Sequence, residues 1–208
     1  MTTPPPLTLP LTSPLTLALS TSSPALSIAL FDGSQLLARR HDVIGRGHAE
    51  ALVPAVAGLL GDVRSARIPT RILVDIGPGS YTGIRIGIAA ARALGLAWGA
   101  DVHGMCALSL VAARAFADDP ALAAVMALID AGRGQAAGAL MRRDLVAPMP
   151  VLVRQAPAGM ATAGAGTLLL PGAPLPRHDD HPDTGFAGLL SPAALGPPAA
   201  LYVSESAG

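Results

Sequence analysis

Residues 71–97 read RILVDIGPGSYTGIRIGIAAARALGLA and carry the strongest indication of architecture in the chain. Residues 71–76 are dense in aliphatic side chains, which is typical of a strand buried on both faces. A glycine-rich turn at 77–83 follows, and an apolar segment then continues to about Trp98. A buried strand, a tight turn and a helix in succession indicate an α/β protein.

The preceding segment has the alternation of β-strands. In 15–20 and again in 26–31, large aliphatic residues occupy every second position. Asp32-Gly33 is a typical tight-turn pair and leads into the apolar residues 36–38. We therefore expect three antiparallel strands at the start of the fold.

Helices and strands are expected to alternate after these strands. Large apolar residues recur at helical spacing in 48–60. A short strand around 102–103 is expected to precede a helix that runs through Phe116. Strands are expected at 122–129 and 135–141, so that helices pack on a sheet.

Proline divides the chain into three parts. Six of the 20 prolines lie in residues 1–24 and ten lie in 148–208. Because proline removes a backbone donor, we expect the middle part to hold most of the regular structure. Residues 1–14 are expected to form a flexible tail.

The composition excludes several classes of protein. The 208 residues include 14 basic and 14 acidic side chains, so no strong long-range attraction for nucleic acid or an anionic membrane is expected. No lysine is present, which excludes a Schiff base and a lysine-containing phosphate loop. The single Cys106 fits a reducing, cytoplasmic setting, and prolines interrupt every long uncharged run, so no membrane span is expected.

The turn at 77–83 has two interpretations. Free N–H groups at a helix start favour an anion or a nucleotide phosphate. Alternatively, the glycines allow close packing of the backbone, and the local physics favours this structural interpretation. The candidate contact residues are Gly77, Pro78, Gly79, Ser80, Tyr81, Thr82 and Gly83.

Several segments together resemble the TsaB family, the non-catalytic subunit in bacterial tRNA threonylcarbamoyladenosine synthesis. The most specific is GPGSYTGIRIGIAAARALGLA at 77–97. The others occur in the order of the family: LALSTSSPALSIAL at 17–30, GRGHAEALVPAV at 45–56, LIDAGRGQAAGAL at 128–140 and ALYV at 200–203. The resemblance is close from about Leu15 to Met141.

The resemblance implies an actin/sugar-kinase/Hsp70-like fold, which is ribonuclease-H-like in its first lobe. It implies a first lobe at 15–117 and a smaller, Pro/Gly-rich second lobe at 118–208. It also implies pairing with a TsaD-type catalytic subunit, participation of a TsaE-type ATPase, and contact with tRNA through the complex. No cofactor is implied for the isolated chain, and ATP or ADP is implied for the complex.

The residues argue against a catalytic role for the chain itself. Ser20 stands where active members of this fold carry an aspartate, and a hydroxyl does not replace that charge beside a divalent cation. The catalytic relative resembles a metalloprotein with two histidines four residues apart, and no two histidines here have that spacing. We therefore expect no catalytic residue and no metal ligand. The tract HDDHPD at 178–183 could bind a metal, but a solvated surface loop is the favoured interpretation.

Other charged residues have open roles. Asp75 is either a functional carboxylate or a group hydrogen-bonded to the backbone of the following turn. Arg85 and Arg92 lie seven residues apart on the second helix, where they either clasp a carboxylate of a partner or are solvated.

The two helices are candidates for a protein interface. Segment 84–97 is apolar nearly all round, and 48–60 carries alanines opposite its large residues. Such helices are ordinarily buried, and the resemblance favours an interface with TsaD or in a homodimer. Gly87 and Ala91 are expected on a smooth outward face. The candidate partner-binding residues are His48, Ala51, Leu52, Ala55, Ile84, Gly87, Ile88, Ala91 and Arg92.

The resulting hypothesis is a non-catalytic partner subunit for tRNA threonylcarbamoyladenosine formation. The first alternative is an independent nucleotide-binding ATPase or kinase of the same fold, with phosphate at the 77–83 turn. The second alternative is a degenerate, inactive paralogue.

Overall fold

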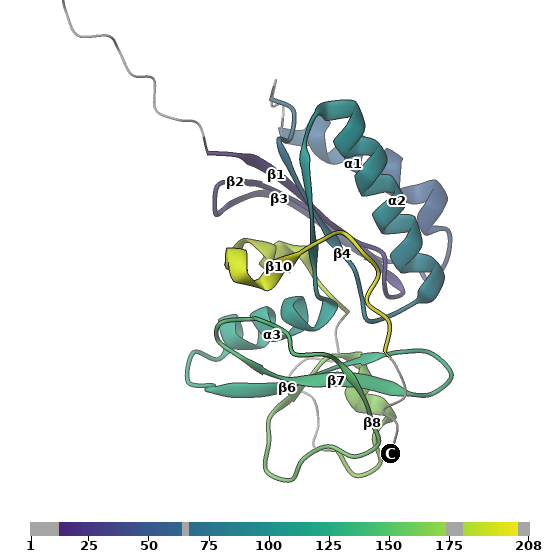
Figure 1. The fold of residues 1–208 in the computed structure, drawn as a ribbon, viewed down its shortest axis with the longest axis vertical. Coiled ribbons are helices and arrows are strands. Elements are labelled where there is room, and N and C mark those ends of the chain that lie inside the picture. The colour runs from purple at the N-terminus through teal and green to yellow at the C-terminus, as the bar shows by residue number, and fades with distance from the viewer. Residues whose placement is uncertain (1–12, 64–66, 174–180, 204–208) are drawn as a thin grey trace, which may run out of the picture.

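The computed structural model describes residues 13–63, 67–173 and 181–203 (Figure 1). The tail expected at 1–14 lies outside the described residues except for its last two. The larger sheet has the strand order β10-β5-β4-β1-β2-β3. Its strands are β1 (Leu15–Ser20), β2 (Ala25–Asp32), β3 (Gln35–Val43), β4 (Arg71–Asp75), β5 (Asp101–Met105) and β10 (Leu195–Gly196).

This topology confirms the expected fold class. β1, β2 and β3 form an antiparallel meander, and β4 and β5 continue from β1 in parallel. The order β3-β2-β1-β4-β5, in which β2 alone runs against the others, is that of a ribonuclease-H-like lobe. The alternation in β1 places Leu15, Leu17 and Leu19 in one apolar cluster, whereas Ala18 lies in another on the opposite face of the sheet.

Two helices cover one face of this sheet (Figure 1). They are α1 (His48–Val63) and α2 (Tyr81–Trp98). Leu52, Val56 and Leu59 of α1 pack with Ile84 and Ile88 of α2 over the sheet. Among the helices of the described ranges, none is both long and apolar enough to span a bilayer.

The start of α2 differs from the expectation. The helix begins at Tyr81, because the side chain of Ser80 accepts a hydrogen bond from the backbone N–H of Gly83 and caps the first turn. The glycine-rich turn is therefore shorter than 77–83, and its last three residues belong to the helix.

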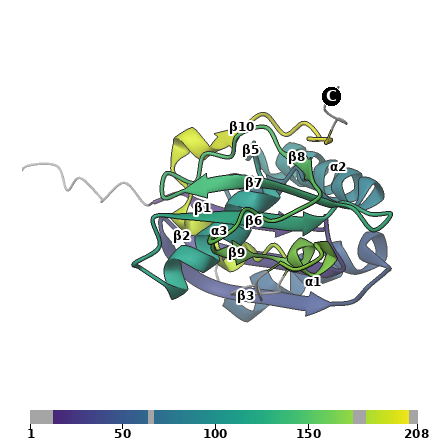
Figure 2. The same cartoon turned by 90° about the horizontal axis from the view of Figure 1, so that it is seen from below.

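The opposite face of the sheet is covered by α3 (Ala107–Asp118) and the 3₁₀ helix η2 (Thr184–Leu189). A second sheet, of order β8-β7-β6-β9, packs on the other side of α3 (Figure 1 and Figure 2). Its strands are β6 (Ala124–Asp130), β7 (Ala136–Arg142), β8 (Val151–Val153) and β9 (Thr162–Ala163). Because α3 lies between two sheets, nine of its twelve residues are buried.

The C-terminal part returns to the first sheet. After η1 (Ala165–Leu169), the chain reaches η2, which contacts β1, β2 and β3. It continues through η3 (Pro192–Ala194) into β10, which pairs with β5. Residues from beyond 118 thus complete the layer around the first sheet, and the division into lobes at 117/118 stays a prediction.

Candidate functional site

The turn before α2 packs tightly on the loop between β1 and β2. The N–H of Ser80 donates to the carbonyl oxygen of Ser22 at 2.6 Å. A Cβ atom on Gly79 would lie 2.3 Å from the same oxygen, and one on Gly83 would lie 1.9 Å from the carbonyl oxygen of Thr21. Two of the glycines are thus required for close backbone approach, which supports the structural interpretation of the motif.

Asp75, at the end of β4, is bound by three neighbours in the protein. Its Oδ2 accepts hydrogen bonds from Ser20 at 2.6 Å and from Ser22 at 2.5 Å. Its Oδ1 accepts one from the backbone N–H of Gly77 at 2.8 Å. Of the two roles left open by the sequence, the carboxylate therefore has the structural one, in which it ties the turn to the first strand.

A small space borders Ser22, one of the hydrogen-bond partners of Asp75. It lies between the two sheets, where Ser22 and Pro78 face Ile129 and Asp130, and its volume is about 20 Å³. That volume holds about one water molecule. Ser20 is fully buried and its hydroxyl is bonded to Asp75, so no carboxylate stands at this strand position to hold a divalent cation.

Burial raises the pKa of the Asp75 carboxyl, although the hydrogen bonds from Ser20, Ser22 and Gly77 lower it in part. A group with a raised folded-state pKa stabilises the fold below its unfolded pKa of about 3.9, and this contribution is lost as the pH rises through the folded-state pKa. The Asp75→Asn variant lacks this titration. Its stability relative to the wild type is therefore expected to increase as the pH rises above about 4.

Urea unfolding of both proteins at several pH values between 4 and 8 measures this difference. The exposed Asp62 provides the matched control, since Asp62→Asn removes a carboxylate that is not buried. Parallel stability curves for wild type and Asp75→Asn would contradict the assignment.

A larger open hollow, of about 720 Å³, lies where both helices of the first face begin. The first turns of α1 and α2 border it, together with the hairpin between β6 and β7. Arg46 and Arg133 line this hollow, and so do Glu50 and Asp130. The acidic and basic side chains of the hollow therefore balance in number.

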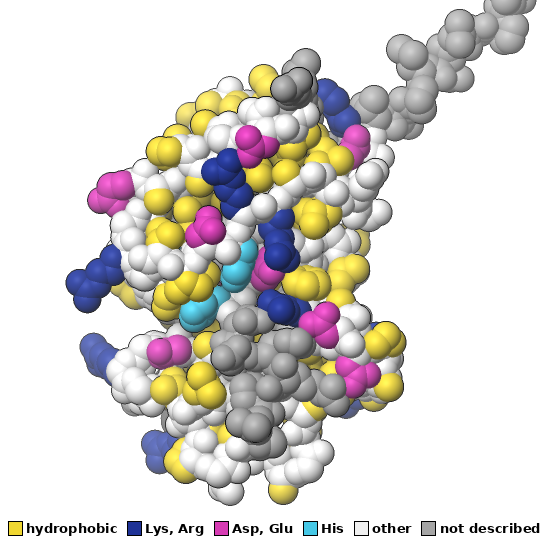
Figure 3. Space-filling model, turned by 180° about the vertical axis from the view of Figure 1, so that it is seen from behind, with side chains coloured by type: hydrophobic (Ala, Val, Ile, Leu, Met, Phe, Trp, Pro, Cys, Tyr) yellow, Lys and Arg dark blue, Asp and Glu magenta, His cyan; other side chains and the backbone are white. Residues whose placement is uncertain are grey.

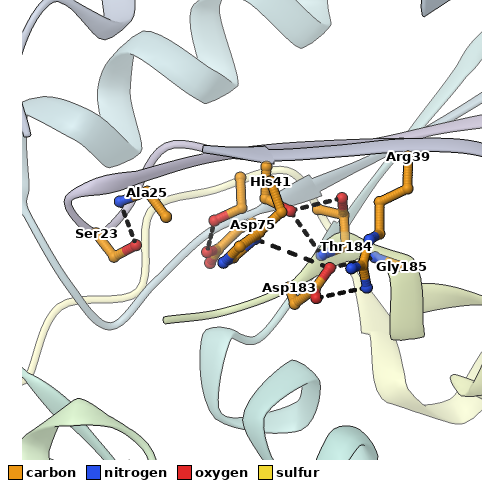
Figure 4. Close-up of polar contacts among 10 residues, drawn as sticks. Ser23, Ala25, Arg39, His41, Asp75, Asp183, Thr184 and Gly185 are labelled. Carbon is orange, nitrogen blue, oxygen red and sulfur yellow. Dashed lines mark hydrogen bonds and ion pairs between the residues drawn. The ribbon is translucent and has the colours of Figure 1, made fainter. Parts of the chain in front are cut away.

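A second buried carboxylate ties η2 to β3. Asp183 is 2% exposed, its Oδ2 lies 2.9 Å from Nη1 of Arg39, and its Oδ1 accepts from the N–H of Gly185. Figure 4 shows Asp183 between Arg39 and His41, whose Nδ1 lies 3.9 Å from Oδ1. Ser27 of β2 hydrogen-bonds the hydroxyl and the N–H of Thr184.

The HDDHPD tract at 178–183 was interpreted as a solvated surface loop, and this interpretation is wrong for its last residue, Asp183. Asp183 is paired and buried, and it is not part of a solvated loop. Residues 178–180 of the tract lie outside the described residues. Figure 3 shows histidine, arginine and acidic side chains gathered on this face, where the upper and lower parts of the molecule meet. Within the described ranges, no group of three or more potential ligands could hold a metal ion.

The candidate partner-binding residues are placed unevenly. Ala51 and Ala55 are half-buried and Arg92 is exposed. The other six are buried in the protein's own core: His48, Leu52, Ile84, Gly87, Ile88 and Ala91.

The prediction that Gly87 and Ala91 lie on an outward face of α2 is therefore wrong, because both are buried. A Cβ atom on Gly87 would lie 2.7 Å from the hydroxyl oxygen of Thr21, and Ala91 has no exposed surface. The small residues let α2 approach its own sheet. The residues that α2 does expose include Ala89, Ala93 and Leu96, and Leu96 is 88% exposed.

Arg85 and Arg92 both contact the C-terminal segment. Nε of Arg85 donates to the hydroxyl oxygen of Tyr202 at 3.1 Å, and Nη2 of Arg92 donates to the carbonyl oxygen of Pro198 at 2.9 Å. Sequence reasoning missed these contacts, as it missed the partners of Asp183. For the contact of Arg85, the available signal was the tyrosine in the short ALYV segment. The partners of Asp183 had no such signal in the sequence.

The comparisons with known proteins agree with this geometry. The family model described as "TsaD: tRNA N6-adenosine threonylcarbamoyltransferase" matches residues 42–145, half of the 208-residue chain. An uncharacterized protein from Mycobacterium leprae is 38% identical over 109 residues, which make up 50% of this chain and 30% of that protein. The "tRNA threonylcarbamoyladenosine biosynthesis protein TsaB" from Bacillus subtilis is 35% identical over 122 residues, 57% of this chain and 51% of that protein.

These curated relatives are matched over about half of their length or less. Among solved structures, YeaZ from Pseudomonas aeruginosa has a TM-score of 0.73 and 25% sequence identity, and the match covers 85% of this chain and 90% of that one. The family model, the named relative and the shared fold lead to one assignment. The chain belongs to the TsaB family, within the wider threonylcarbamoyltransferase-type family that the model describes.

Proposed function

We propose that this chain is a non-catalytic subunit in the formation of tRNA threonylcarbamoyladenosine, and that it binds a TsaD-type catalytic subunit through α1 and α2. The name of the Bacillus subtilis relative supports the pathway. The match to the threonylcarbamoyltransferase model supports a partner of related fold. The reaction takes place in the cytoplasm, with a TsaE-type ATPase as a further component and tRNA contacted through the complex.

The surroundings of Asp75 are the single observation that carries the non-catalytic role. The carboxylate is buried, and its two oxygens already accept hydrogen bonds from Ser20, Ser22 and the N–H of Gly77. The metal ion that accompanies a nucleotide needs free acceptor atoms, and these hydrogen bonds occupy both oxygens of Asp75. These residues favour a subunit that supports another protein's active site.

The outward faces of the two helices support the proposed interface. On α2, the exposed alanines Ala89 and Ala93 lie beside the exposed Leu96, and α1 adds Val53, which is 53% exposed. Small side chains let another helix approach closely, and exposed large apolar ones gain free energy when they are covered. A helical partner therefore fits this face, either the catalytic subunit or, less specifically, a second copy.

The variant Ala93→Glu tests this surface, because a buried charge opposes binding in an apolar interface. Its affinity for the purified catalytic subunit is expected to fall by about 100-fold or more, measured by calorimetry. Ala117→Glu, at an exposed alanine of α3, is the matched control and keeps wild-type affinity. Unchanged binding by a folded Ala93→Glu protein would refute the interface. Ala91 is unsuitable for this test because it is fully buried.

Reconstitution tests the function itself. The catalytic subunit, the ATPase and tRNA are combined with and without this chain, and threonylcarbamoyladenosine is quantified. Modification is expected only when the chain is present. If the chain makes no difference, it is an inactive paralogue, and the proposal is wrong.

Calorimetry with ATP and magnesium on the isolated chain tests the alternative of an independent ATPase or kinase. The balanced charge of the hollow beside α1 and α2 leads us to expect no magnesium-dependent binding at micromolar concentrations. Micromolar binding would favour the nucleotide-binding alternative.

A further inference from the structure

Both tyrosines of the chain meet on its surface. Tyr81 opens α2 and Tyr202 lies near the end of the described residues, yet their ring centroids are 5.3 Å apart. Arg85 joins them: its Cζ lies 3.8 Å from the centroid of the Tyr81 ring, and its Nε donates to the hydroxyl oxygen of Tyr202. We call these three residues the tyrosine–arginine cluster.

The cluster is exposed although it is well ordered by contacts. Tyr81 is 55% exposed and Tyr202 is 43% exposed. Tyrosine and arginine are, with tryptophan, the residues most enriched among those that dominate binding energy at protein interfaces. Side chains that are already held in place lose less conformational entropy when a partner binds.

The C-terminal strap, residues 197–203, holds Tyr202 in position. The N–H of Leu201 donates to the carbonyl oxygen of Ile76 at 2.8 Å, next to the turn before α2. Arg92 donates to the carbonyl oxygen of Pro198, about two turns beyond Arg85 along α2. The strap is therefore attached at the turn and on α2, with Tyr202 beside the first attachment.

Arg85 keeps hydrogen-bonding capacity that the cluster does not use. Its Nε is bonded to Tyr202, and neither Nη atom has a hydrogen bond to the described part of the chain. Two parallel N–H groups of a guanidinium match the two oxygens of a carboxylate. α2 contains Arg85 and Arg92 and no acidic residue, so its charge also favours an acidic partner.

We propose that the tyrosine–arginine cluster is an anchor that receives an aspartate or glutamate side chain of the catalytic subunit, and that Tyr202 is its positioning residue. This inference rests on the proposed function, because it assigns a specific contact within that interface. The cluster is continuous with the exposed Ala89 and Ala93 on the same helix. An apolar helix surface with only two arginines fits a protein better than RNA, which requires a wider basic surface.

Calorimetry between the full chain and the purified catalytic subunit tests the anchor. Arg85→Lys keeps the charge but loses the planar pair of donors, and we expect its Kd to rise about tenfold or more. Tyr202→Ala removes the ring and the hydroxyl, and a similar loss is expected. Tyr202→Phe keeps the ring, so it is expected to bind between the wild type and Tyr202→Ala. Arg142→Lys, at the end of β7, is the matched control with unchanged affinity.

The salt dependence of the affinity for the catalytic subunit shows whether Arg85 forms an ion pair across the interface. A variant that is only less stable would not change this dependence. Wild-type affinity is expected to fall more steeply with salt than that of Arg85→Gln, because that variant lacks the ion pair. Circular dichroism melts identify any variant that fails to fold. If Tyr202→Ala does not fold, the affinity of the milder Tyr202→Phe variant tests the role of Tyr202.

Two results would overturn the anchor. In the first, Arg85→Lys and Tyr202→Phe bind as the wild type does while Ala93→Glu abolishes binding; the interface then stands without the anchor. In the second, the variants bind the catalytic subunit normally but weaken binding of tRNA by the complex in a filter assay, which makes the cluster an RNA contact. Normal binding by Ala93→Glu instead refutes the interface, and tRNA modification that does not depend on this chain refutes the proposed function, so these failures are distinguishable from failure of the anchor.

Discussion

Replacing Gly83 with alanine is expected to destabilise the protein by about 3 kcal/mol or more, enough to unfold it at moderate temperature. The added Cβ would lie 1.9 Å from the carbonyl oxygen of Thr21, and that oxygen belongs to backbone. Backbone cannot move aside as the end of a side chain can. Thr21 also donates its own hydroxyl to the carbonyl oxygen of Gly83 at 2.7 Å, so the two segments are held at this distance from both sides.

Thermal and urea unfolding, followed by circular dichroism, measure the effect. Gly61 supplies the control, because it also lies in a helix and a Cβ there would meet no atom within 4 Å. Gly61→Ala is expected to stabilise α1 by about 0.5–1 kcal/mol. A Gly83→Ala variant as stable as the wild type would contradict the claim that α2 packs closely against the β1–β2 loop at Gly83.

Removing the carboxylate of Asp183 is expected to cost about 2–3 kcal/mol. The Asp183→Ala variant loses the ion pair with Arg39 and the acceptor for the N–H of Gly185. It also leaves that N–H group without its partner inside the protein. Arg39 is partly exposed, and water partly compensates its charge, which keeps the expected loss at the lower end for a buried pair.

The second ion pair of β3 provides the control for this variant. Arg40 is about as exposed as Arg39, but the carboxylate of Asp62 is exposed where that of Asp183 is buried, so Asp62→Ala is expected to cost less than about 1 kcal/mol. Hydrogen exchange of residues 184–189 adds a local measurement: their amides are expected to lose protection in Asp183→Ala and to keep it in Asp62→Ala. Equal losses of stability in both variants would contradict the role of Asp183.

Much of the fold could be predicted from the sequence because local patterns encode it. Large and small side chains alternate in 15–20 and 26–31, and this alternation indicates β-strands. Both strands are buried on both faces of the sheet. Asp32-Gly33 marks the hairpin between β2 and β3, and Gly33 has a φ of 60° there. The motif at 77–87, together with the other segments in the same order, is specific enough to indicate the family without any structure.

The orientation of α2 could not be predicted in the same way. A helix that is apolar nearly all round has no polar stripe to mark its solvent side, so Gly87 and Ala91 were placed outward when they face the sheet. Contacts between residues far apart in the sequence could not be predicted either. Asp183 and Arg39 are 144 positions apart, and Tyr202 and Arg85 are 117 apart. No periodicity connects residues at such separations.

The return of the chain to the first sheet has a consequence for biosynthesis. β10 and η2 come from residues 184–196, so a nascent polypeptide that has just completed β5 still exposes that strand's edge and the face that η2 later covers. Unpaired edges and uncovered apolar faces promote aggregation of incomplete chains. Synthesis of residues 184–196, or a chaperone that shields the edge until they emerge, therefore controls when the first sheet can be completed.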